Sequence, residues 1–95
     1  METYYLLRSQ TDGRYLAALL EERGSGYLLI FQEHADALSY INTHAQDAAN
    51  RFAVESSTRS RLGELIKRWG FSGVGIVSDP LIPKIEFLKH TSGNP

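Results

Sequence analysis

The sequence predicts a single α+β domain. We expect a two-layer sandwich with the order β-β-β-α-β-α-β-β, with two helices packed on one face of a mixed or antiparallel sheet. Three observations predict this fold. Short apolar runs are bounded by glycine and proline turns, which is typical of strands. Two longer segments repeat their apolar residues with the period of an amphipathic helix, and the 95 residues are close to the roughly 100–200 residues of one domain.

The first third of the chain predicts three strands joined by two turns. Thr3–Arg8 is rich in aromatic and aliphatic residues, as strands are. The Asp-Gly pair in Thr11–Arg14 favours a type I′ hairpin turn. Tyr15–Leu20 is then the returning strand, although its alanines and leucines leave a short helix open. A polar turn over Glu21–Gly26 leads to Tyr27–Phe31, whose unbroken apolar run is typical of a strand covered on both faces.

Two amphipathic helices follow, separated by a strand over Arg51–Glu55. The apolar stripe of the first helix, Glu33–Ala45, consists of Ala37, Leu38, Ile41 and Ala45. The stripe of the second helix consists of Leu62, Leu65, Ile66 and Trp69. The hydroxyls of residues 56–58 offer N-caps for the second helix, and Gly70 is expected to end it in the left-handed conformation.

Two strands complete the predicted domain, which spans residues 1–89. Gly73–Val77 has the composition of a buried strand, and an Asp-Pro turn ends it. Lys84–Leu88 alternates, with Ile85 and Phe87 predicted to point inward. Residues 90–95 are polar and predict a flexible tail.

Composition excludes several classes of protein. The formal net charge of −1 argues against a general nucleic-acid binder or a membrane-surface binder. Without cysteine the chain has no disulfide, thiolate zinc site or thiol nucleophile. No apolar run approaches the roughly 20 residues of a membrane span. We therefore expect a soluble, cytoplasmic protein.

The stretch from Leu28 to Pro80 resembles a known family. It contains the runs LLIF, EHADALSYI and LGELIKRWGFSGVGIVSDP. This order of strand, helix and helix–glycine–strand unit is similar to the SseB N-terminal-type domain. The segment HADALSYINTHA also resembles small uncharacterised proteins of cyanobacterial type. The resemblance implies a regulatory or interaction module, and it carries no catalytic residue to this chain.

Candidate catalytic and metal-binding residues are few. His34 and His44 lie ten positions apart on one predicted helix, roughly 15 Å along its axis. That separation prevents them from sharing a metal ion. Asp47 is a local partner for His44, and neither a nucleophile motif nor a carboxylate pair is evident. We therefore predict no catalytic residue, no metal and no cofactor.

A cluster of hydroxyls and guanidiniums marks the start of the second helix. Free amide groups and the helix dipole favour an anion there, and two arginines in a first turn oppose that dipole. A phosphate or a partner carboxylate would explain the arginines, whereas simple N-capping with solvated arginines is the alternative. The candidate anion-binding residues are Ser57, Thr58, Arg59, Ser60 and Arg61.

A candidate protein interface combines tyrosines with the basic second helix. Tyrosines on an open sheet face are typical of contact surfaces. Residues 1–50 contain 3 basic and 7 acidic residues, and residues 51–95 contain 7 and 4, a polarity that can steer a charged partner. The candidate interface residues are Tyr4, Tyr5, Tyr15, Tyr27, Lys67 and Arg68. Stacking of nucleobases on these rings is disfavoured by the acidic surroundings.

These observations predict a non-catalytic interaction or regulatory module that binds another protein of unknown identity. The alternative is a small sensor of anions or phosphate ligands at Ser56–Arg61. The third hypothesis is an enzyme. It requires a concave site in which His34 or His44 lies close to a carboxylate from another element. Pairing of edge strands, such as Tyr15–Leu20 or Lys84–Leu88, across a homodimer stays open.

Overall fold

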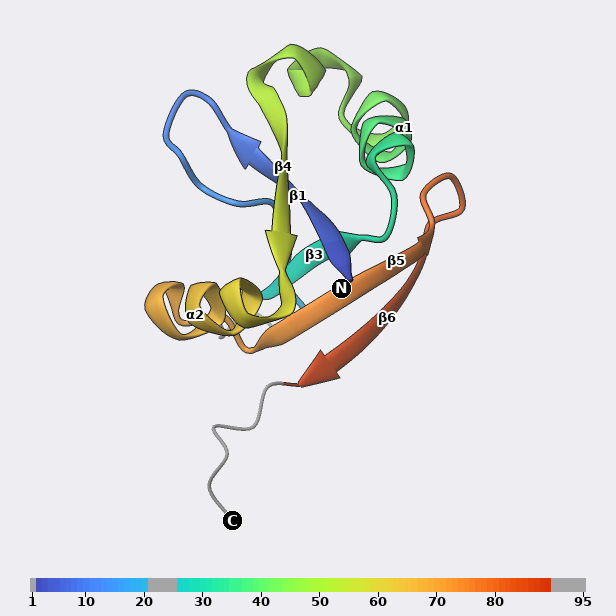
Figure 1. The fold of residues 1–95 in the computed structure, drawn as a ribbon. Coiled ribbons are helices and arrows are strands. Elements are labelled where there is room, and N and C mark those ends of the chain that lie inside the picture. The colour runs from blue at the N-terminus through green and yellow to red at the C-terminus, as the bar shows by residue number, and fades with distance from the viewer. Residues whose placement is uncertain (1, 21–25, 90–95) are drawn as a thin grey trace.

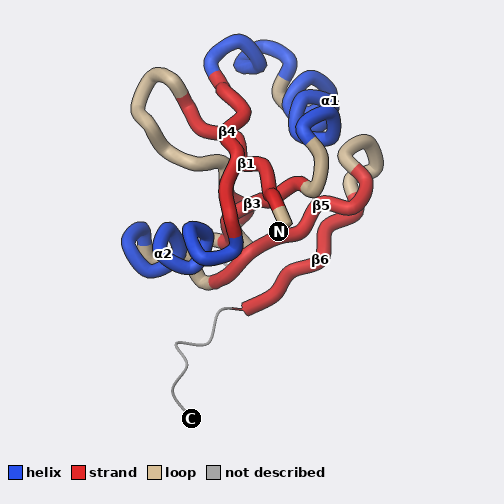
Figure 2. The backbone as a smooth tube through the Cα atoms, in the orientation of Figure 1, coloured by secondary structure: helices blue, strands red, loops and turns tan. Residues whose placement is uncertain are grey.

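The chain forms one mixed sheet flanked by helices (Figures 1 and 2). The computed structural model describes residues 2–20 and 26–89. The predicted tail and all but the last residue of the Glu21–Gly26 turn lie outside the described residues. The strands are β1 (Thr3–Ser9), β2 (Ala17–Ala18), β3 (Tyr27–Phe31), β4 (Phe52–Thr58), β5 (Gly73–Asp79) and β6 (Lys84–Lys89). The helices are α1 (His34–His44), the 3₁₀ helix η1 (Gln46–Arg51) and α2 (Arg59–Trp69).

The order of strands in the sheet is β4-β1-β3-β5-β6. The short strand β2 lies off this path and pairs with β3. Strand β1 runs antiparallel to β4 along its whole length, from Thr3 opposite Thr58 to Ser9 opposite Phe52. Strands β3 and β5 are parallel, while β5 and β6 are antiparallel. The predicted α+β class is therefore confirmed. Of the two sheet types that the sequence left open, the structure has the mixed one, with β4 and β6 at its edges.

The first hairpin turns where the sequence predicts, but its turn is not of type I′ and its second strand is shorter than predicted. The Ser9 amide donates to the Arg14 carbonyl at 2.7 Å, which closes a loop over residues 10–13. Within it only Gly13 has a positive φ, of 73°, whereas a type I′ turn needs two such residues. The returning strand shortens to a bridge at Tyr15 and the two residues of β2, because β1 diverges from β3 and β2 fills the space between them.

The two helices pack on opposite faces of the sheet, so the prediction that both cover one face was wrong. Leu62 and Leu65 of α2 join a core cluster that contains Leu6, Leu28 and Ile30. The neighbouring strand positions contribute to a second cluster, which α1 covers with two of its own residues. That second cluster consists of Leu7, Leu29, Phe31, Ala37, Ile41 and Val77.

The physical reason for this arrangement is the alternation of side chains along a strand. Strand β3 is apolar at every position, and its last four residues are buried, so both of its faces require a cover. Figure 1 shows α1 and α2 on either side of β1, β3 and β5. The fold is thus three layers deep through its central strands rather than a two-layer sandwich.

Most of the predicted helix positions are confirmed, with two exceptions. In α1, Leu38 is 43% exposed, because the buried side is formed by Ala37 and Ile41. In α2, the last member of the predicted stripe, Trp69, is 39% exposed. Gly70 does end α2 in the left-handed conformation, with φ 73°.

Candidate interaction site

Helix α2 forms a ridge with a different hollow along each flank. Its N-cap is Thr58, whose hydroxyl accepts a hydrogen bond from the Arg61 amide at 3.3 Å. At its other end the Phe71 amide donates to the Ile66 carbonyl at 3.0 Å, a bond typical of a Schellman ending. These caps fix both ends of the helix and therefore the direction in which its exposed residues project.

The hollow on the first flank is polar, and we call it the basic pocket. Two guanidinium groups and the hydroxyls of the first turn line it together with one carboxylate. Its lining residues are Thr58, Ser60, Arg61, Glu64, Leu65 and Arg68. Because Arg61 and Arg68 share this hollow, it can attract an anion, although the carboxylate of Glu64 opposes that attraction.

The candidate anion-binding residues do not all converge on the basic pocket. Arg59 lies on the other flank of α2, near Tyr4. Ser57 is 4% exposed, and its hydroxyl donates to the Thr58 carbonyl at 3.3 Å. Of the five predicted residues, the structure brings only Thr58, Ser60 and Arg61 together.

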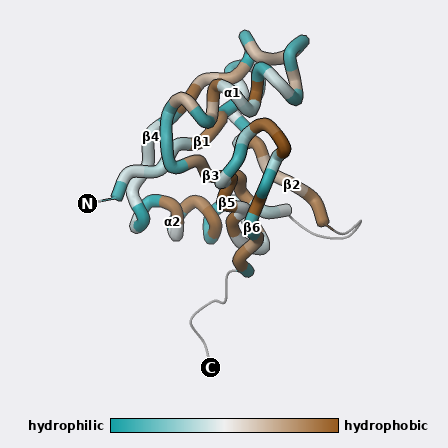
Figure 3. The backbone as a smooth tube through the Cα atoms, turned by 90° about the vertical axis from the view of Figure 1, so that its right-hand side faces the viewer, coloured by the Kyte–Doolittle hydropathy of each residue, from teal (hydrophilic) through white to brown (hydrophobic). Residues whose placement is uncertain are grey.

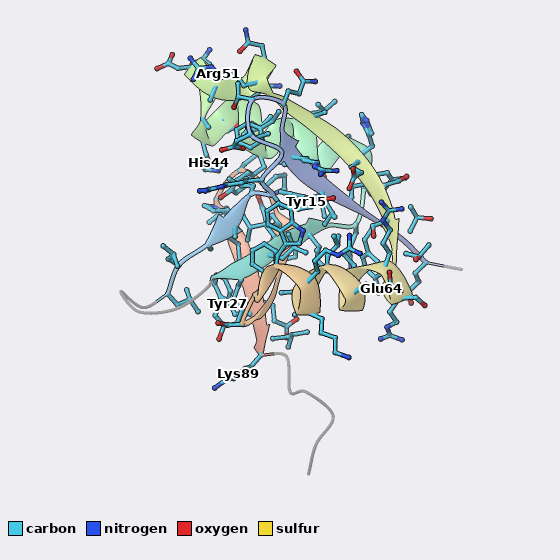
Figure 4. All side chains as sticks on the ribbon, turned by 90° about the vertical axis from the view of Figure 1, so that its left-hand side faces the viewer. Tyr15, Tyr27, His44, Arg51, Glu64 and Lys89 are labelled. Carbon is cyan, nitrogen blue, oxygen red and sulfur yellow. The ribbon has the colours of Figure 1, made fainter. Side chains whose placement is uncertain are left out.

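A polar cluster beside α2 consists of Arg8, Tyr15 and Glu55. The Tyr15 hydroxyl donates to Glu55 Oε2 at 2.6 Å, and Arg8 Nη1 donates to Glu55 Oε1 at 3.3 Å. The Arg8 guanidinium also lies 4.9 Å from the centre of the Tyr15 ring. The Tyr15 ring meets Trp69 edge to face at 5.6 Å, so this cluster joins the hairpin, β4 and α2 (Figure 4).

The environment of Tyr15 changes the acidity of its hydroxyl. Burial raises the pKa of Tyr15 above its ordinary value, and the hydrogen bond to Glu55 raises it further. The positive charges of Arg8 and Arg61 act in the opposite direction with smaller effect. The Tyr15 phenol therefore stays protonated near neutral pH and serves as a hydrogen-bond donor to the Glu55 carboxylate.

The second flank of α2 carries a mostly apolar hollow, which we call the apolar groove. It lies between the helix and strands β5 and β6. Its lining residues are Tyr4, Ile30, Arg59, Leu62, Gly63, Ile66, Val74, Ile76 and Leu88. Sequence reasoning missed this groove, because its members range over the chain from β1 to β6. The one local signal was Gly63, a poor helix former in the middle of a strongly amphipathic helix.

The predicted tyrosine surface is dispersed over the molecule. Tyr4 and Tyr15 pack against the core cluster on the α2 face, and Tyr5 packs against the cluster on the α1 face. Tyr27 meets Phe87 edge to face, with ring centres 5.4 Å apart, and Figure 4 shows it well apart from Tyr15. Because helices cover both faces, the four rings do not form one open surface. Lys67 is exposed on α2 but lines neither hollow.

The two predicted helix histidines make structural contacts. His34 meets the Tyr5 ring edge to face at 5.8 Å. His44 Nε2 lies 2.8 Å from the Pro80 carbonyl oxygen and packs against Tyr40. These contacts fasten α1 to β1 and to the turn between β5 and β6.

Two further places carry exposed apolar residues, the end of β2 and the turn between β5 and β6, and both segments are brown, the colour of hydrophobic residues, in Figure 3. Leu19 and Leu20 are 68% and 53% exposed, and Leu81 and Ile82 are 61% and 75% exposed. Across residues 2–20 and 26–89, no set of three or more metal-ligating side chains is close enough to hold an ion. In the same residues, none of the helices has the length and apolar character needed to cross a membrane.

No family model, curated protein or solved structure matches this chain. The similarity of residues 28–80 to the SseB N-terminal-type domain therefore stays a prediction. The fold and the two flanks of α2 are the basis for any functional assignment.

Proposed function

We propose that this protein is a non-catalytic interaction module that binds an acidic partner protein through α2. One observation carries the proposal. Four exposed cations project from this helix against a single carboxylate, Glu64: these cations are Arg59, Arg61, Lys67 and Arg68. Within the described residues, the ion pairs are Arg8–Glu55 at 3.3 Å and Arg14–Asp12 at 4.0 Å, and neither involves α2.

Unpaired cations along a helix support recognition of an acidic surface. A partner carboxylate gains charge-assisted hydrogen bonds from arginine, and these are about twice as strong as neutral ones. The exposed apolar side chains beside the helix supply contact area that excludes water. A cytoplasmic location, with which the absence of cysteine is consistent, belongs to the same proposal, as does kinship with SseB-type regulatory modules.

Affinity capture from a native extract tests this function. The wild-type domain is compared with Arg61→Glu/Arg68→Glu, and captured proteins are quantified by mass spectrometry. We expect the double variant to lose the acidic proteins that the wild type retains. Arg14→Glu/Arg51→Glu is the matched control, since it makes the same change in charge at exposed positions away from α2. Equal capture by all three proteins would exclude α2 as the binding element.

A second candidate function is an anion sensor at the basic pocket, which the shared lining by Arg61 and Arg68 favours. Its test is thermal unfolding in the presence of inorganic phosphate and nucleotides. A ligand at one hundred times its dissociation constant stabilises the folded state by about 2.7 kcal/mol. An unchanged unfolding temperature across the series would remove this candidate.

A further inference from the structure

The apolar groove is a stretch of sheet that α2 covers only in part. Ile30, Val74 and Ile76 lie at its base, and Leu62 and Ile66 of α2 form one wall. Leu88 on β6 lines the groove from the edge of the sheet. The groove therefore has an apolar base and at least one apolar wall, which suits an apolar side chain.

The exposure of the base shows that α2 covers only part of this face. Strand β5 is an inner strand, paired on both sides by β3 and β6. Its residue Val77, under α1, is fully buried, whereas Val74 and Ile76, on the α2 side, are only half-buried. Leu88 is 46% exposed. Apolar surface thus stays in contact with water at a place where an inner strand is normally covered.

Gly63 points to the same place from the helix. A glycine inside a helix lowers the stability of the helix by roughly 1 kcal/mol relative to alanine. The glycine at position 63 therefore needs an explanation. Apart from its chain neighbours and the backbone of its own helix, a Cβ atom added at Gly63 would have no atom of the described residues within 4 Å. Packing inside this chain therefore does not require a glycine there. Its effect is to leave the groove open, which a larger side chain would partly fill.

Charge identifies the kind of occupant. Among residues 2–20 and 26–89, Arg59 is the one charged residue that lines the apolar groove, and it lies near Tyr4. The Tyr4 hydroxyl donates to Glu2, whereas Arg59 has no carboxylate within 4 Å among the described residues. An occupant that carries a carboxylate beside apolar groups is complementary to this arrangement.

We propose that the apolar groove binds a peptide segment of an acidic partner protein, with apolar side chains seated between α2 and β5 and an adjacent carboxylate on Arg59. This inference rests on the proposed function and names the partner chemistry. The groove has a volume of about 240 Å³, below the roughly 300–1,000 Å³ of pockets that enclose a small molecule. It suits one or two side chains of a peptide. Residues 90–95, HTSGNP, contain neither a side-chain carboxylate nor a large aliphatic side chain.

Selection from a displayed library of random peptides tests the proposal. The wild-type domain is the bait, and the peptides that it enriches are sequenced. We expect the enriched peptides to place Asp or Glu within two residues of Leu, Ile, Phe or Trp. Synthetic versions are then titrated by fluorescence anisotropy against the wild type, Gly63→Leu, Arg59→Gln, Arg61→Glu/Arg68→Glu and Arg51→Gln. Arg51→Gln is the matched control, because it removes one positive charge at an exposed position of η1, away from α2 and the groove.

The proposal expects at least tenfold weaker binding to Gly63→Leu and about tenfold weaker binding to Arg59→Gln, with Arg51→Gln within twofold of the wild type. Leucine has a higher helix propensity than glycine, so Gly63→Leu should not weaken α2. If its circular dichroism spectrum matches that of the wild type, a loss of peptide affinity comes from the filled groove. Equal affinity for wild type and Gly63→Leu, or selected peptides without acidic residues, would overturn the proposal. So would a doubling of mass at working concentration that Gly63→Leu abolishes, which would identify a second copy as the occupant.

The arms of this experiment separate the inference from the proposed function. If peptides bind and respond to Arg61→Glu/Arg68→Glu but not to Gly63→Leu, the groove is wrong and α2 remains the binding element. If no peptide is enriched while capture from extract still depends on Arg61 and Arg68, the peptide groove again fails alone. If neither assay responds to any α2 variant, both are wrong.

Discussion

Gly63 and Gly75 have opposite surroundings, and this difference predicts opposite effects of the same substitution. A Cβ at Gly75 would lie 2.9 Å from Leu29 Cδ2 and 3.1 Å from both Ile85 Cγ2 and Phe87 Cε1. We expect Gly75→Ala to lower the free energy of unfolding by about 1–3 kcal/mol through overpacking. Gly63→Ala should raise it by about 0.5–1 kcal/mol through helix propensity alone. Urea denaturation of the two variants checks both signs, and a destabilising Gly63→Ala would contradict the open space described at that position.

The hydrogen bond from Tyr15 to Glu55 predicts a stability effect that depends on pH. At pH 7, Tyr15→Phe should lower the free energy of unfolding by about 1–3 kcal/mol, because it removes a bond to a charged acceptor. The pKa of Tyr15 is raised in the folded state above its ordinary value of about 10. Its stabilising contribution is therefore complete below pH 10 and is lost as the pH rises through the folded-state pKa.

The difference between wild type and Tyr15→Phe should accordingly shrink above pH 10. Tyr4 and Tyr40, whose pKa values are also raised, titrate in both proteins and cancel in the difference. Urea denaturation at pH 7 and at pH 10.5 provides the measurement. A difference that grows with pH would show that folding lowers the pKa of the Tyr15 phenol instead of raising it.

The start of α2 depends on one side chain, which predicts a selective response at the scale of the element. The Thr58 hydroxyl accepts a hydrogen bond from the Arg61 amide at 3.3 Å. Loss of such an N-cap lowers the free energy of unfolding by about 1 kcal/mol. We expect Thr58→Ala to lower the free energy of unfolding by that amount and Thr58→Ser to leave it nearly unchanged. Chemical denaturation followed by circular dichroism measures both. Equal losses in the two variants would show that the methyl group, rather than the hydroxyl, stabilises this junction.

Periodicity predicted the elements well, because each depends on its own residues. The stripe of Leu62, Leu65 and Ile66 is buried in α2, and the αL residue Gly70 ends the helix where the sequence places it. The short 3₁₀ helix η1 was not predicted, since its alanines and polar residues have no apolar period. Leu38 was assigned to the core because periodicity does not show where the buried side of a helix ends. Leu38 follows the buried residue Ala37 but is itself exposed.

The arrangement of elements was harder to predict, because it depends on contacts between distant residues. The unbroken apolar run Tyr27–Phe31 was the one local indication that α1 and α2 lie on opposite faces of the sheet, because such a run implies that both faces of the strand are covered. Strand order has no local signal: β1 pairs with β4, about 50 residues later in the chain. The apolar groove depends on that order, since Tyr4 and Leu88 line one hollow only after β1, β3, β5 and β6 have assembled.

At the scale of the whole molecule, the sheet separates the cations of α2 from the acidic residues around α1. Asp36 lies in the first turn of α1 and Asp47 in the first turn of η1, whereas the first turn of α2 contains no acidic residue. Such a polarity orients a charged partner before contact, and salt screens it over about 10 Å at 0.1 M. Orientation and seating are therefore expected to involve different residues of the same helix.

This division predicts distinct kinetic effects for peptides that bind the apolar groove. Arg61→Glu/Arg68→Glu should lower the association rate constant about tenfold at low salt and change dissociation little, since charges at the rim mainly steer encounter. Gly63→Leu should mainly raise the dissociation rate constant, because it removes the seat of the apolar side chains. Stopped-flow fluorescence with a labelled peptide at 20 mM and 500 mM salt measures both constants. An association rate that is independent of salt in the wild type would show that the opposed charges have no part in recognition, and that shape alone selects the partner.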